Sequence, residues 1–245
     1  MVHKTKGIVI RCIKFGDTSL IAHIFTELFG LQSYLIKGIR KTSKKKPNHI
    51  VFFQAGAILD LEVYHNNLKN LQYIKEYSWA FVYQQVLFNV VKNAIVSFNM
   101  ELLQQVLKQP EPMPELFEFV EYSLHYVDES DQAAAANVPL FFMLKLSHLL
   151  GFQIFGEYHV NSPVLDLQAG NFVSNIPDSP FYLIQEDARV ISELNKIASF
   201  SELPNIVLNQ QKRRALLSAY LQYLKMHIEG MKEPKSFFVL QEVLS

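Results

Sequence analysis

The sequence predicts an α+β chain with two parts, a small β-barrel in residues 1–78 and a mostly α-helical domain in residues 79–245. Two observations predict this division. Short segments rich in β-branched and aromatic residues, separated by turn signals, fill the first part. From about Ser78 onward, apolar residues recur instead with the 3.6-residue period of a helix. Because 49% of the 245 residues are apolar, the chain can form a core without disulfides.

The first part is expected to contain five short strands. Pairs such as Gly16-Asp17 and Asn66-Asn67 mark turns between them. In the first strand, alternation places Ile8, Ile10 and Cys12 on one face. Five short strands joined by turns are typical of the OB-fold, a barrel whose surface commonly binds oligonucleotides. The expected strands cover residues 7–15, 20–26, 31–38, 57–65 and 68–77.

The second part is expected to be mostly helical, with one irregular insertion. Residues 139–151 are apolar nearly all round, which predicts a buried central helix. Residues 152–187 contain scattered Gly, Pro, Asn and Ser and are predicted to be irregular, with short elements. The other expected helices cover the apolar stripe from Val86 to Val106, residues 115–126, residues 212–229 and a short stretch after Pro234.

The overall net charge of zero conceals an asymmetry. Residues 1–46 contain ten basic and two acidic residues, a net charge of +8, and the rest of the chain carries −8. Six of the ten residues in KGIRKTSKKK, residues 37–46, are basic. A local cationic field attracts polyanions, so the two parts are expected to have different partners.

The sequence lacks the motifs of common enzyme classes. It has no Gly-rich phosphate loop and no GxSxG nucleophile elbow. The single cysteine, Cys12, excludes an internal disulfide and a cysteine-cluster zinc site and is expected in the barrel core. Glu118, Glu121 and His125 share a helix face, either as half of a di-metal site or as a solvated acidic face. We therefore predict no enzyme, no metal and no cofactor.

The sequence also predicts a cytoplasmic protein. The opening MVHKTKGIVI lacks the apolar stretch of a signal peptide, and no apolar run is long enough to span a bilayer.

The cationic segment 37–46 allows two interpretations. Alone, it is a flexible and solvated loop. It also joins two predicted barrel strands, where an OB-fold presents loops that contact its ligand, and Arg11 and Lys14 would extend its charge across the sheet. Phe15 and Tyr34 either stack on bases or pack internally. The predicted nucleic-acid contacts are Arg11, Lys14, Lys37, Arg40, Lys41, Lys44, Lys45 and Lys46.

A second basic cluster, Lys212, Arg213 and Arg214, opens the long amphipathic helix. The helix dipole disfavours positive charge at this end by about a few tenths of a kcal/mol per residue, so the cluster indicates a function. DNA phosphate or an acidic peptide are its candidate ligands. The alternative is a solvated first turn without a ligand.

Residues 5–41 resemble the opening of the bacterial RecO family of recombination mediators. The family pattern of strand, turn, strand, Gly, strand and basic signature appears here in order, and the helix end LKLSHLLGFQIF (residues 144–155) and the last helices (residues 220–244, with Lys235-Ser236) are also similar. The matching N-terminal motifs are Gly16-Asp17-Thr18-Ser19, Thr26-Glu27, Gly30 and Lys37-Gly38-Ile39-Arg40-Lys41.

The resemblance implies an N-terminal OB-fold, a helical C-terminal domain and a non-enzymatic role in DNA repair by homologous recombination. It implies binding of ssDNA and dsDNA, annealing of complementary strands, engagement of the SSB C-terminal tail, and help, together with RecR, in loading RecA. It also implies a nucleoid-associated protein. Many relatives carry a four-cysteine zinc module after the buried helix, but residues 152–184 contain no cysteine, so no zinc is expected.

Two other functions remain open at the level of sequence. One is a general RNA-binding OB module with a helical appendage. The other is a protein scaffold whose cationic loop is only solvated and which binds no nucleic acid.

Overall fold

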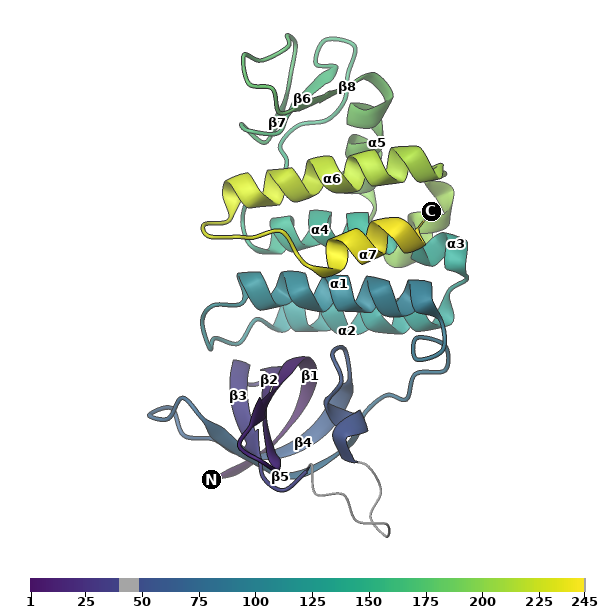
Figure 1. The fold of residues 1–245 in the computed structure, drawn as a ribbon. Helices are drawn as coiled ribbons and strands as arrows, with labels where there is room; N and C mark the ends of the chain where they lie inside the picture. The colour runs from purple at the N-terminus through teal and green to yellow at the C-terminus, as the bar shows by residue number, and fades with distance from the viewer. Residues whose placement is uncertain (40–48, 245) are drawn as a thin grey trace.

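We describe residues 1–39 and 49–244 in a computed structural model of the chain. The N-terminal barrel lies at one end, helices are stacked above it in layers, and a small three-stranded sheet lies at the far end (Figure 1). The α+β class and the order of barrel and helices are therefore confirmed. The division into separate folding units at residues 78 and 79 stays a prediction.

Five strands close the barrel in the order β1-β2-β3-β5-β4. Strand β1 pairs with both β2 and β4, and only β3 and β5 run parallel to each other. This order gives an OB-like barrel. A short 3-10 helix, η1 (His49–Phe53), precedes β4 and contributes the buried Phe53 to the barrel core. The strands are β1 (Val2–Phe15), β2 (Ser19–Thr26), β3 (Gly30–Ile36), β4 (Ile58–Tyr64) and β5 (Gln72–Trp79).

The set of β1 residues that faces the barrel core changes partway along the strand. Its register against β2 shifts between Val9 and Arg11, which marks a β-bulge. Ile8 and Ile10 pack in the helical core, whereas Val9 and Cys12 pack in the barrel core. The prediction of one face for Ile8, Ile10 and Cys12 is therefore wrong for Cys12, because the extra residue of a bulge breaks the alternation.

Helices α1 (Val90–Val106) and α2 (Pro114–Glu129) cover one end of the barrel (Figure 1). Two glycines with positive φ allow the barrel and the helices to approach each other closely. A Cβ added at Gly30 would lie 2.0 Å from the backbone oxygen of Glu111, in the loop between the two helices. A Cβ added at Gly56 would lie 2.4 Å from Cγ1 of Val96 on α1. Any larger residue at either position would force the barrel and helices apart.

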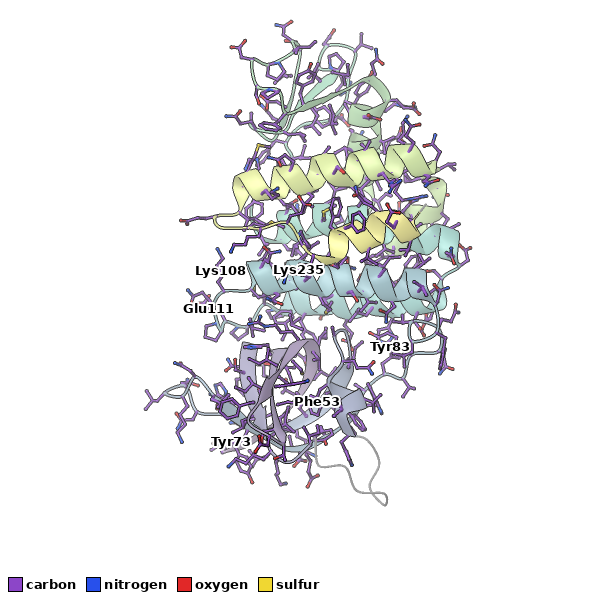
Figure 2. The ribbon with its side chains drawn as sticks, in the orientation of Figure 1. Phe53, Tyr73, Tyr83, Lys108, Glu111 and Lys235 are labelled. Atoms are coloured by element: carbon purple, nitrogen blue, oxygen red, sulfur yellow. The ribbon has the colours of Figure 1, made fainter. Side chains whose placement is uncertain are left out.

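The linker between β5 and α1 is held by buried polar groups. The carboxylate of Asp128 accepts hydrogen bonds from the backbone N–H groups of residues 84, 85 and 86 at 2.8 Å. Buried Lys92 donates to the side chain of Gln85 and to the backbone carbonyls of Asp128 and Ser130. Burial lowers the pKa of Lys92, and these acceptors stabilise its charge. Tyr83 also donates to the carbonyl of Gly56 (labelled ring, Figure 2).

The remaining helices pack above α1 and α2. Helix α4 is the one predicted to be central, and its first seven residues are all buried. Ser147 on α4 and Tyr220 on α6 share a hydrogen bond of 2.7 Å. The carboxylate of Glu101 on α1 accepts from the backbone N–H groups of Lys235 and Ser236 and so caps α7. These helices are α3 (Gln132–Ala135), α4 (Val138–Leu149), α5 (Gln185–Lys196), α6 (Gln210–His227) and α7 (Ser236–Val243).

The predicted irregular insertion contains a small sheet made of β6 (Val164–Asp166), β7 (Asn171–Val173) and β8 (Tyr182–Ile184). Helix α5 begins at Gln185, inside the region predicted to be irregular. Its start carries two acidic residues, Glu186 and Asp187, which favour a helix N-terminus. The 3-10 helix η2 (Phe200–Asn205) follows α5.

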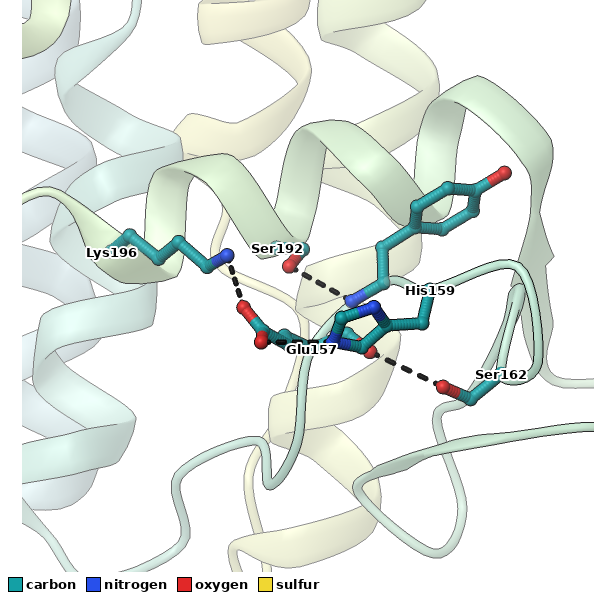
Figure 3. Close-up of polar contacts among 6 residues, drawn as sticks. Glu157, His159, Ser162, Ser192 and Lys196 are labelled. Atoms are coloured by element: carbon teal, nitrogen blue, oxygen red, sulfur yellow. Dashed lines mark hydrogen bonds and ion pairs between the residues drawn. The ribbon is translucent and has the colours of Figure 1, made fainter.

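Polar contacts hold this cysteine-free insertion to the helices. The Tyr158 backbone N–H donates to the Ser192 hydroxyl at 3.0 Å. Glu157 lies between His159 and Lys196 and contacts both (Figure 3). Hydrogen bonds with Lys196, the larger cause, and with His159 lower the pKa of Glu157. On the opposite side, Tyr223 OH donates to the Phe152 carbonyl at 2.6 Å. The insertion thus has direct side-chain attachments to both α5 and α6.

Candidate nucleic-acid interface

The outer face of β1, β2 and β3 carries two cross-strand rows. The first row consists of Arg11, His23 and Ser33, which pair in register across the three strands. The second row, two residues further along β1, is apolar and reaches β5. Residues in register within one row project to the same side of the sheet. The second row consists of Ile13, Ile21, Leu35 and Tyr73.

A cation and an aromatic ring lie together at the end of the apolar row. Nζ of Lys37 lies 5.5 Å from the centroid of the Tyr73 ring, within the range of a cation–π contact. The Tyr73 side chain is 41% exposed, and Phe15 at the end of β1 is 50% exposed. Exposed rings beside cations are the usual elements of a surface that stacks bases and binds phosphates.

Lys14 lies at the rim of the barrel. It pairs with Leu20, which in turn pairs with Ile36, and Lys37 follows directly. Both lysines and Arg11 are exposed. Within residues 1–39 and 49–244, none of the three forms an ion pair, so their charges face solvent uncompensated. The structure thus places Arg11 and Lys37 on outer rows of the barrel and Lys14 at its rim, in the row of Leu20 and Ile36.

His23 lies between Arg11 and Ser33 in the first row. Burial lowers its pKa below the usual 6.5, and the neighbouring Arg11 lowers it further. Its Nδ1 shares a hydrogen bond of 3.0 Å with the Ser33 hydroxyl, and its Nε2 is buried without a partner in the described part of the chain. His23 is therefore neutral at pH 7, and the charge of this row comes from Arg11.

The structure also shows which predicted residues do not lie on this surface. Tyr34 is fully buried in the barrel core, so the packing interpretation of its ring is the correct one. Sequence reasoning overlooked Tyr73, although it projects outward on a strand that was expected at residues 68–77. The predicted contacts Arg40, Lys41, Lys44, Lys45 and Lys46 lie outside the described residues.

The second basic cluster is engaged within the protein. Lys212 pairs with Glu186 and lies 3.9 Å from Asp187, both on α5. The Arg214 guanidinium lies 2.8 Å from the carboxylate of Glu242 on α7. These pairs offset the charge that the first turn of α6 would otherwise present to a ligand.

Arg213 is the most deeply placed member of this cluster. Its Nε donates to the side-chain oxygen of Asn137 at 3.0 Å, and its NH2 group donates to the Leu208 carbonyl at 2.9 Å. Burial lowers the pKa of the guanidinium. Asn137 in turn donates to the Ile206 carbonyl, so Arg213 belongs to a network that joins α4 and α6.

The acidic helix face on α2 does not assemble a metal site. Glu121 pairs with Lys6 of the barrel at 2.7 Å, and the ring of His125 lies 4.0 Å from that of Phe81. Glu118 is exposed. In the described ranges, no group of three or more His, Cys, Asp or Glu residues is placed to hold a metal. No described helix is long and apolar enough to cross a membrane.

Comparisons with known proteins agree with this architecture. Family models described as "Recombination protein O N terminal" and "Recombination protein O C terminal" match residues 1–83 and 87–236. The chain is 33% identical to the DNA repair protein RecO of Flavobacterium psychrophilum and 32% identical to that of Christiangramia forsetii, over 99% of each chain. It is 27% identical to the protein of the same name from Phocaeicola vulgatus over 100% of both chains. The chain therefore belongs to the RecO family.

Proposed function

We propose that this protein is a mediator of DNA repair and homologous recombination that binds ssDNA and dsDNA without sequence preference and acts at the nucleoid. Membership of the RecO family supports a role in repair and recombination. The observation that carries the DNA-binding part is the exposed pair of Lys37 and Tyr73 on the outer face of the barrel that also carries Arg11. This surface offers both a cation for phosphate and a ring for a base.

The proposed contacts extend from this surface along the cationic segment. Lys37 begins the segment at the end of β3, Lys14 lies across from this end through Leu20 and Ile36, and Arg11 precedes Lys14 on β1. Each basic residue that neutralises a phosphate releases condensed counterions, which drives binding without reading the sequence. The segment contributes Arg40, Lys41, Lys44, Lys45 and Lys46 to the proposal.

Strand annealing follows from the same charge. Two complementary strands repel each other through their phosphates, and a cationic surface reduces that repulsion so that the bases can pair. The protein supplies no chemical step in this mechanism, so we propose that it is not an enzyme and needs no cofactor.

The proposed protein partners are RecR and the C-terminal tail of SSB, with RecA loading as the outcome. The acidic SSB tail was one candidate ligand for Lys212, Arg213 and Arg214. The carboxylates of Glu186 and Glu242 already occupy two of these cations. We therefore assign the barrel surface, and not this cluster, as the main DNA site.

Salt-dependent anisotropy tests the proposal. A labelled single-stranded oligonucleotide is titrated into the native protein and into a Lys41→Ala/Lys44→Ala/Lys45→Ala/Lys46→Ala variant. The slope of log K against log salt should shrink by about 0.7 for each phosphate that the variant no longer neutralises. Competition by RNA of the same sequence separates a DNA mediator from an RNA-binding module.

An equal slope for the two proteins would remove the segment from the site and leave the barrel face. Absence of binding by the native protein would overturn the DNA-binding function and favour a scaffold.

A further inference from the structure

A cleft of about 510 Å³ lies next to the proposed DNA surface. The β2–β3 turn, the loop between β4 and β5, and the loop between α1 and α2 form its walls. Its volume is within the range of about 300–1,000 Å³ that is typical of small-ligand sites. The cleft is lined by Phe29, Ser33, His65, Asn67, Lys69 and Asn70, among others.

The cleft continues the surface that carries the cation and the ring. Ser33 lines the cleft and is also the last member of the Arg11 row. Gln72 lines it too, and directly precedes Tyr73. Ser33 lies two residues from Leu35, and Gln72 lies one residue from Tyr73, which pairs with Leu35. At about 3.3 Å per residue, both lining residues lie within about 7 Å of this pair along their strands. A strand of DNA that stacks on Tyr73 therefore passes the mouth of the cleft.

The walls of the cleft are preformed. Gln72 is buried and its carboxamide bonds to the backbone of Asn66 and Lys69, which fixes the β4–β5 loop. Gln32 is also buried and donates to the carbonyl of Phe29 at 2.7 Å. The close contact between Gly30 and the backbone of Glu111 holds the third wall (Glu111 is labelled in Figure 2). A preformed site loses little conformational entropy when a ligand binds.

A stacked pair of rings lies in one wall. The rings of Phe29 and His65 are 3.9 Å apart between centroids and 13° from parallel. Nε2 of His65 lies 2.6 Å from the side-chain oxygen of Asn67, which only accepts, so Nε2 carries the proton. Nδ1 is buried without a partner in the described part of the chain. This wall of the cleft thus combines a stacked aromatic pair with an unpartnered ring nitrogen.

The charge of the lining favours a nucleotide. Among the described lining residues Lys69 is the one cation and none is acidic, and the acidic Glu111 lies between the lining residues Pro110 and Pro112. The groove along β1, β4 and β5 is different, because its acidic residues Asp60, Glu62 and Glu76 outnumber its lysines, Lys4 and Lys6. Carboxamides such as those of Asn67 and Asn70 both donate and accept, as base edges do.

We propose that this cleft receives one unpaired base of a bound single strand, with Lys69 beside its phosphate. The inference rests on the proposed DNA-binding function. The base stacks against the wall that holds His65, and the asparagines at the mouth contact its edge. The cleft then anchors one nucleotide while the exposed ring of Tyr73 holds a neighbour.

Photo-crosslinking and two matched variants test the proposal. A thymidine oligonucleotide of about 16 nucleotides, the upper site size of an OB-fold, carries one 4-thiothymidine at varied positions. Crosslinked peptides are mapped by mass spectrometry, and affinity is measured by anisotropy. Asn70→Glu introduces a carboxylate at the cleft, and Asn175→Glu makes the same change at an exposed asparagine next to the small sheet.

We expect crosslinks to the peptide that contains His65. We also expect Asn70→Glu to bind at least about fivefold more weakly, as for removal of one stacked base, and Asn175→Glu to bind like the native protein. If the oligonucleotide binds but crosslinks only outside the cleft, or if both variants bind equally, the cleft proposal is overturned and the DNA-binding function stands. If the native protein does not bind the oligonucleotide, both fail together.

Discussion

The two basic clusters of this chain look alike in sequence and differ in their surroundings. Arg11 and Lys37 lie exposed on the barrel and form no ion pair within residues 1–39 and 49–244. Lys212 and Arg214 face carboxylates of other helices, and Arg213 donates to two oxygen atoms inside the protein. The barrel cluster is thus available to a ligand, whereas the α6 cluster connects helices.

This difference shows what a run of basic residues does and does not indicate. A cation offers binding energy to phosphate only if the fold has not already supplied its counter-charge. The partners of the α6 cluster are Glu186, Asn137 and Glu242, which are distant from it in sequence. Substitutions in each cluster test whether the two divide binding and stability between them.

The largest effect is expected from Arg213→Ala. Its removal leaves the oxygens of Asn137 and Leu208 without their donor, and an unsatisfied buried acceptor costs about 1–3 kcal/mol. We expect the free energy of unfolding to fall by about 2–3 kcal/mol in urea denaturation, with unchanged DNA affinity in the folded protein. Arg11→Ala should have the opposite pattern. It should change the free energy of unfolding by less than about 0.5 kcal/mol and weaken DNA binding. If the Arg213→Ala protein is stable but no longer binds DNA, the α6 cluster and not the barrel cluster binds DNA.

The next largest effect is expected from substitution of Tyr73, whose ring lies at the barrel surface. Tyr73→Ala removes an exposed ring on which a base can stack, and such stacking contributes about 1–3 kcal/mol per base. We expect Kd for single-stranded DNA to rise by about fivefold or more, measured by anisotropy at fixed salt. Tyr73→Phe keeps the ring and should bind like the native protein. Equal weakening by both substitutions would assign the effect to the hydroxyl, and no weakening would remove Tyr73 from the DNA path.

A smaller effect separates Lys37 from Lys212. Lys37→Ala should reduce the salt slope of single-strand binding by about 0.7, the value for one neutralised phosphate. Lys212→Ala should leave the slope unchanged, because Glu186 already pairs with this lysine. Titrations between about 50 and 200 mM salt measure both slopes. A reduced slope for Lys212→Ala would show that DNA competes successfully with Glu186 for the lysine.

Much of the fold could be predicted because local patterns determine it. The five barrel strands were predicted from turn signals and β-branched residues, and the buried helix α4 from its uniform apolarity. The bulge in β1 could not be predicted, because it is defined by the pairing of Val9 and Arg11 with a partner strand. Helix α5 was not among the expected helices, because Gly, Pro, Asn and Ser favoured an irregular segment through residue 187 and no helix was predicted for the residues that follow.

The site was predicted less completely. Basic residues can be identified directly in the sequence, but the acidic residues that pair with them in the fold cannot. Arg11, Lys14 and Lys37 were identified as cations, and the structure places Arg11 and Lys37 on outer rows of the barrel and Lys14 at its rim. Whether they contact DNA stays a prediction. The cleft beside them could not be predicted, since its walls come from three loops that only the closed barrel and the α1–α2 loop bring together.

The smallest expected effect concerns the pKa of His23, which lies next to Arg11 on the barrel. Burial and then Arg11 lower the pKa of His23, so the folded protein binds this proton more weakly than the unfolded chain does. The unfolding free energy should therefore fall as the pH drops below about 6.5, where an unfolded histidine protonates. In Arg11→Ala the pKa should rise but stay below 6.5, because burial remains the larger cause.

An NMR titration of the His23 ring measures this pKa directly. If Arg11→Ala leaves the pKa unchanged, the guanidinium charge does not reach the ring. The same titration, repeated with a bound DNA strand, tests where DNA binds. A phosphate placed against Arg11 offsets its charge and should raise the pKa of His23, whereas a strand on the α6 cluster should not. The His23 resonance thus reports which of the two clusters DNA occupies.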